Sequence, residues 1–169
     1  MFDDALALKA RAELARLKEL ERLQAEEKKL DEYRRDPLLY FEERLGIRRE
    51  TIDWELNEEY RGQEWDGTRN PFVRVLEAIG ENRWVGVESA TGTGKTHFGA
   101  LLVLWFLECF ENSIVVTTAP KQDQLALHIW KEIGALLPKF GRGEMTQLRL
   151  RMIPGEDRWL ALGFVAGVF

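Results

Sequence analysis

The stretch VGVESATGTGKTHFG, residues 85–99, joins an apolar run, a glycine-containing turn and the start of an apolar helix in direct succession. Loops that bind phosphate follow the pattern Gly, four residues, then Gly-Lys and Thr or Ser. Gly94, Lys95 and Thr96 fit the end of this pattern, and the first position holds Ser89 in place of Gly. The stretch therefore predicts a phosphate-binding loop.

The residues on either side of the loop favour the same interpretation. Residues 84–87 (Trp-Val-Gly-Val) predict a short strand before the loop, and residues 98–110 predict an apolar helix after it. Strand, loop and helix then follow in the order that a phosphate-binding loop requires. The alternative is a glycine-containing turn that only begins a buried helix.

In a loop of this kind, backbone N–H groups and the start of the helix surround the phosphates. Lys95 is the predicted catalytic residue, because its ammonium would reach the β and γ phosphates of ATP. Thr96 would offer its hydroxyl to Mg²⁺, and Gly92 lies where the loop needs a positive φ. His97 could reach the γ-phosphate, although a histidine in a first helical turn is more often incidental. The predicted nucleotide-binding residues are Ser89, Ala90, Thr91, Gly92, Thr93, Gly94, Lys95 and Thr96.

The composition of the chain sets limits on its function. Its 169 residues, 45% hydrophobic and 31% charged, suffice for one globular domain and an appendage. The net charge of −5 gives no overall basic surface, so any contact with nucleic acid has to be local. The single cysteine, Cys109, and the absence of a signal-like start or a long apolar segment favour a reducing cytoplasm and no membrane.

The chain divides into three predicted parts. Residues 1–47 form a helical extension: a long helix from about 5 to 35, then a second helix that opens at Asp36-Pro37 and ends at Gly46. Residues 48–69 are polar and turn-rich and predict a linker or lid. Residues 70–169 form the predicted core, which begins with a helix through Ile79 that ends at Gly80.

Beyond the loop helix, residues 113–120 predict a buried parallel strand and residues 122–137 a helix that Pro138 ends. Two further strands are expected around residues 148–152 and 158–165, joined as a possible hairpin. Alternating strands and helices predict an α/β fold with a parallel sheet.

Four stretches taken together resemble the large subunit of the bacteriophage terminase, the viral motor that packages DNA into capsids. These stretches are DPLLYFEERLGI (36–47), NPFVRVLEAIGENRWVGV (70–87), ATGTGKTHFGALLVLWF (90–106) and VVTTAPKQDQLALHIWKEI (115–133). The resemblance implies an incomplete P-loop NTPase sheet of the helicase-like, additional-strand type, preceded by the long helix. It also implies an ATP-binding hydrolase of the Walker A class that uses Mg²⁺ and acts in the cytoplasm of a bacterial host cell.

The resemblance further implies double-stranded DNA as a partner, and a homo-oligomer on a portal together with a small terminase subunit. No run of four apolar residues followed by Asp-Glu stands after the loop. The acids of the family's Walker B motif and its nuclease domain are therefore expected beyond Phe169, and this segment alone is expected to have little or no ATPase activity.

Two other functions remain open on the sequence. The loop ATGTGKT would serve equally well in another helicase-like, DNA-dependent ATPase. The chain could also be a non-catalytic assembly module in which the long helix recruits a partner and the loop is structural.

Overall fold

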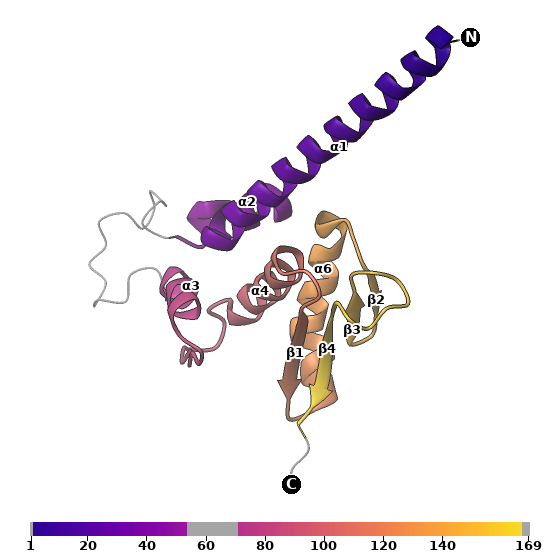
Figure 1. Ribbon diagram of the computed structural model, residues 1–169. Helices are drawn as coiled ribbons and strands as arrows, with labels where there is room; N and C mark the ends of the chain where they lie inside the picture. Colours follow the sequence, from indigo (N-terminus) through magenta and orange to yellow (C-terminus); the bar gives the residue numbers. More distant parts are fainter. Residues whose placement is uncertain (1, 54–70, 167–169) are drawn as a thin grey trace.

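The computed structural model describes residues 2–53 and 71–166 (Figure 1). In chain order, its elements are α1 (Phe2–Arg35), α2 (Pro37–Leu45), the 3₁₀ turn η1 (Arg49–Thr51), α3 (Pro71–Glu81), α4 (Lys95–Cys109), β1 (Ile114–Ala119), α5 (Gln122–Gln124), the π-helical turn η2 (Leu125–Ile129), α6 (Trp130–Phe140), β2 (Glu144–Thr146), β3 (Arg149–Arg151) and β4 (Leu160–Val165). Helices and one sheet are thus combined in the described part. None of its helices has both the length and the apolar character needed to cross a membrane.

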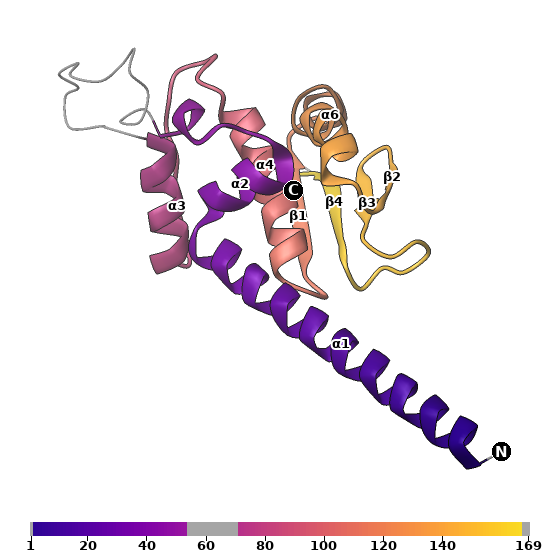
Figure 2. The same cartoon turned by 90° about the horizontal axis from the view of Figure 1, so that it is seen from above.

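The two predicted N-terminal helices are confirmed. Residues with high helix propensity fill α1, whose N-terminal part extends away from the rest of the molecule (Figures 1 and 2). Asp36 caps α2 by accepting the N–H of Leu39 at 3.1 Å, and Gly46 ends the helix at φ 62°. The leucines of α1 that recur at three-residue spacing are 44–54% exposed: Leu14, Leu17, Leu20 and Leu23.

The centre of the core is α4, which is apolar around most of its circumference. Nine of its residues are buried: Phe98, Ala100, Leu101, Val103, Leu104, Trp105, Leu107, Glu108 and Cys109. A helix that is apolar on all sides has to be covered on all sides. Here α2, α6 and the C-terminal end of α1 pack against α4, and both β1 and β4 contact it.

The sheet has the strand order β1-β4-β3-β2. β1 runs parallel to β4, and β4 pairs antiparallel with β3, so the predicted C-terminal hairpin is confirmed. β2, which the sequence did not predict, adds an antiparallel edge strand. The predicted burial of β1 is wrong: Ile114 and Val116 on one face are 56% and 52% exposed, and the residues of the other face are only partly buried.

The predicted strand at residues 84–87 is absent. These residues have no regular secondary structure, and the side chains of Trp84, Val85 and Val87 are 87%, 37% and 49% exposed. A strand needs a neighbour with which its N–H and C=O groups can pair. In the described residues the sheet that forms does not include this segment, so its apolar side chains alone do not make it a strand.

Two predicted helix ends are also wrong. Pro138 lies inside α6, which continues to Phe140 and ends at Gly141 (φ 72°). Proline removes one helical hydrogen bond but does not prevent a short continuation when a glycine in the left-handed conformation stands just beyond it. α3 likewise passes through Gly80 to Glu81, and Asn70, at its predicted start, lies outside the described residues.

The contact between β4 and α6 provides a test of the fold. A Cβ atom on Gly163 would lie 2.8 Å from Nε1 of Trp130, whose N–H donates to Oγ1 of Thr117 on β1 at 3.0 Å. Gly163→Ala should therefore displace the buried indole and lower the free energy of unfolding by about 1–3 kcal/mol, measured by urea denaturation.

The matched control is Gly86→Ala, because a Cβ atom there meets no atom within 4 Å. Its free energy of unfolding should stay within about 0.5 kcal/mol of the wild-type value. Equal effects of the two substitutions would contradict this packing of α6 on the sheet.

Candidate functional site

The predicted phosphate-binding loop leads directly into α4. Gly92 and Gly94 have φ values of 84° and 81°. Glycine adopts this left-handed backbone conformation without the strain that a side chain would cause. Oγ of Ser89 lies 2.9 Å from Oγ1 of Thr93, which also donates to the carbonyl of Ala90 at 3.1 Å. These contacts close the loop on itself, and the predicted positive φ of Gly92 is confirmed.

The side chain of Lys95 folds back into this loop. Its Nζ donates to the carbonyl oxygens of Ser89 at 2.7 Å and Ala90 at 2.6 Å. An ammonium group has three donors, and these two bonds leave one of them for another acceptor. Anionic oxygens bind an ammonium more strongly than neutral carbonyls do. The arrangement therefore places a cation where the loop could exchange carbonyl contacts for contacts with an anion.

The backbone at the start of α4 adds further donors. The first helical hydrogen bond runs from the N–H of Phe98 to the carbonyl of Gly94 at 2.9 Å, and no side chain caps this end. The N–H groups of Lys95, Thr96 and His97 precede that bond and are the ones a helix leaves without internal partners. The loop therefore presents a group of N–H donors and the positive end of the helix dipole together.

The residues at the loop do not form a magnesium site by themselves. Thr96 is exposed, and its hydroxyl could be one ligand. Mg²⁺ in nucleotide sites also needs one or two carboxylates, and within the described residues no group of three or more Asp, Glu, His or Cys could hold a metal. We therefore assign no chemical step to a metal held by these residues.

A cavity of about 420 Å³ adjoins the loop. Thr93, Gly94 and His97 line its side next to the loop. The rest of the lining comes from the chain that follows α2, including η1, and from α3 and α4: Gly46, Ile47, Arg48, Thr51, Ile52, Phe72, Phe98 and Leu101. Cavities of this size, mostly apolar with a few polar groups, are typical of small-molecule sites.

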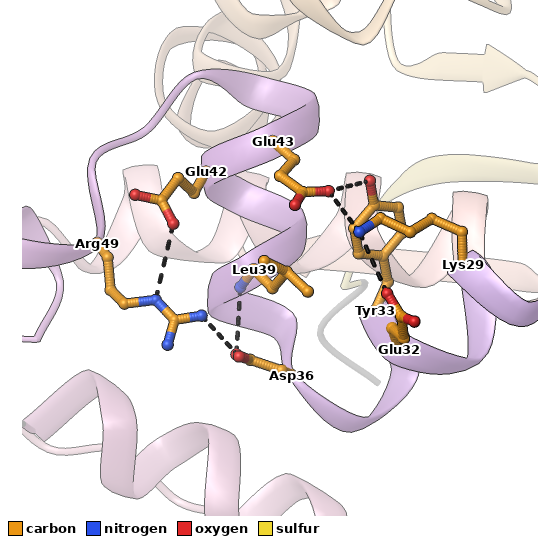
Figure 3. A network of polar contacts seen from close by, with 8 residues as sticks. All are labelled: Lys29, Glu32, Tyr33, Asp36, Leu39, Glu42, Glu43 and Arg49. Atoms are coloured by element: carbon orange, nitrogen blue, oxygen red, sulfur yellow. Dashed lines mark hydrogen bonds and ion pairs between the residues drawn. The ribbon is translucent and has the colours of Figure 1, made fainter.

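A polar network holds the wall of the cavity that η1 forms (Figure 3). Arg49 donates to Oδ2 of Asp36 at 2.6 Å and lies 3.9 Å from Glu42. The carboxylate of Asp36 therefore both caps α2 and binds η1. Lys29 bridges Glu43 and Glu32, and these hydrogen bonds raise the pKa of Lys29 to about 12. The first residues of the predicted linker are thus part of the packed structure, whereas the remainder, residues 54–69, lies outside the described residues.

A second polar group fixes α2 on α4. Glu108 is 8% exposed and accepts the hydroxyl of Tyr40 at 2.9 Å and two N–H groups of Arg44 at 2.6 and 2.9 Å. Burial of Tyr40 next to this carboxylate raises the pKa of the phenol well above its usual value. This contact holds α2, whose C-cap Gly46 lines the cavity, on the helix that begins at the loop.

Glu108→Ala should lower the free energy of unfolding by about 2–3 kcal/mol, because the buried Tyr40 hydroxyl loses its acceptor. The effect should be smaller than for a fully buried ion pair, since the Arg44 side chain is 40% exposed and water can solvate it. Urea denaturation measures the change.

Glu13→Ala is the matched control, because the Glu13 side chain on α1 is 59% exposed. Its effect should stay within about 0.5 kcal/mol. A Glu108→Ala protein as stable as this control would show that the contact between Glu108, Tyr40 and Arg44 does not hold α2 in place.

Comparisons of the chain with protein-family models, with curated proteins and with solved structures found no match. Of the predicted residues 89–96, the first six form the loop and Lys95 and Thr96 begin α4. The structure also adds residues that the sequence analysis did not single out. Arg48, Ile52 and Phe72 join the site from segments far along the chain. Glu132 on α6 lies 2.9 Å from His97, and no motif or spacing in the sequence indicates this pair.

Proposed function

We propose that the chain is the N-terminal ATPase segment of a phage terminase large subunit, which couples ATP hydrolysis to DNA translocation. The observation that carries the proposal is the geometry of the loop. Lys95, at the start of α4, contacts the carbonyls of Ser89 and Ala90, and the two loop glycines, Gly92 and Gly94, have positive φ. The four stretches of resemblance supply the choice of a terminase among P-loop motors.

In this proposal the loop binds the triphosphate of ATP. The N–H groups of Lys95, Thr96 and His97 donate to phosphate oxygens, and the Lys95 ammonium moves from its carbonyl partners to the β and γ phosphates. The neighbouring cavity, with Ile47, Ile52 and Phe72 in its lining, offers an apolar surface for the nucleoside.

Binding and catalysis are expected to separate in this chain. Charge neutralisation and positioning of the attacking water supply most of the rate of phosphoryl transfer, and an acidic group usually contributes to both. After the loop, the sequence has no run of four apolar residues followed by Asp-Glu. We therefore propose that the segment binds ATP and Mg²⁺ but hydrolyses ATP very slowly by itself.

The partners of the complete motor follow from the same resemblance. They are double-stranded DNA, further copies of the subunit on a portal, and a small terminase subunit. The net charge of −5 means that DNA would have to meet a local surface rather than the whole domain.

Lys95→Ala should weaken the binding of a fluorescent ATP analogue with Mg²⁺ by about 10–100-fold. A charge-assisted hydrogen bond contributes about 1.5–3 kcal/mol, which corresponds to that range of affinity. Fluorescence titration measures the binding, and a steady-state assay should find negligible phosphate release from the wild-type segment.

Lys18→Ala is a suitable control, since it removes one exposed cation from α1, far along the chain from the loop. This variant should bind the analogue like the wild type. Equal binding by the wild type and by Lys95→Ala would refute the proposal and leave the loop a structural turn.

A further inference from the structure

His97 lies at the boundary between the loop and the cavity. It is the third residue of α4, two positions after Lys95, and its side chain lines the cavity together with Gly94 and Thr93. Its Nδ1 is 2.9 Å from Oε2 of Glu132, and the two side chains are 43% and 35% exposed. The pair is thus partly open to a ligand, unlike a buried structural ion pair.

Glu132 is held by a firmly packed helix. On the same helix, Trp130 is 1% exposed and Ile133 is fully buried. The Trp130 indole donates to Thr117 of β1 at 3.0 Å and lies against Gly163 of β4. Because both α4 and α6 are fixed in the core, the hydrogen bond to Glu132 restricts the orientation of the imidazole ring.

The cavity next to His97 has an aromatic residue from another helix. Phe72 of α3 stacks on Phe98 with ring centroids 4.4 Å apart and lies 3.8 Å from the Cβ position of Gly94. Phe72 and His97 therefore both border the space directly beside the loop. If the phosphates of a ligand occupy the loop, the group attached to those phosphates lies in this space. In a nucleotide, that group is the nucleoside.

We propose that His97 contacts the nucleoside of the bound nucleotide and that Glu132 is the residue that positions it. Planar bases pack favourably on aromatic rings, and this contact does not depend on the phosphates. His97 thus distinguishes a nucleoside triphosphate from triphosphate alone, whereas Lys95 binds the phosphates of both. This inference rests on the proposed function, because it requires the loop to bind phosphate.

Isothermal titration calorimetry with MgATP and with magnesium tripolyphosphate separates these roles. His97→Ala should weaken MgATP binding by about tenfold and leave tripolyphosphate binding unchanged. His97→Phe, which keeps a ring, should restore most of the affinity for MgATP. Lys95→Ala should weaken the binding of both ligands.

The Glu132 variants test the positioning role. Glu132→Gln keeps an acceptor for Nδ1–H and should bind MgATP like the wild type, whereas Glu132→Ala should weaken MgATP alone, by less than His97→Ala does. Thermal unfolding of each variant provides a check of folding. If His97→Ala lowers the melting temperature strongly, the comparison of His97→Phe with Glu132→Ala decides the question in its place.

Two outcomes would overturn the inference. Equal weakening of both ligands by His97→Ala would make His97 a phosphate contact, and no change in either would make the pair with Glu132 purely structural. Failure of the proposed function looks different, since Lys95→Ala would then leave the binding of both ligands unchanged.

Discussion

The need to bury α4 determines how the other elements of the core are arranged. Its sequence is apolar on nearly every side, so α2, α6 and the end of α1 have to cover it, and the two parallel strands contact it as well. The same requirement places Gly94, just before this helix, beside the C-cap of α2, the chain around η1 and Phe72 of α3. The loop and its cavity are thus a consequence of how the core covers one helix.

Polar contacts at the edges of the core determine how its elements meet. Glu108 joins α4 to α2 through Tyr40 and Arg44. At the C-terminal end of α1, the indole N–H of Trp105 donates to the carbonyl of Tyr33, and the guanidinium of Arg34 donates to the carbonyl of Cys109. Burial leaves the thiol of Cys109 with a pKa raised to about 12, in keeping with an inert core residue. These contacts connect the long helix α1 to the helix that carries the loop.

Local signals predicted much of this structure, since caps, glycines and helical periodicity act over a few residues. Asp36, Gly46 and Gly92 all have the predicted role. Signals that depend on distant partners failed. Residues 84–87 resemble a strand but have no pairing partner in the described sheet, and neither β2 nor the contact between His97 and Glu132 has a local signature. Sequence reasoning therefore located the loop but not the walls of its cavity.

Hydrogen–deuterium exchange with and without excess MgATP would show whether the segment from Ser89 to Thr96 binds phosphate. Peptides that cover the loop and the first turn of α4 should exchange more slowly with the nucleotide, because their N–H groups donate to phosphate oxygens. A peptide from residues 11–24 of α1 should be unaffected. Unchanged exchange across the loop in excess MgATP would contradict the account.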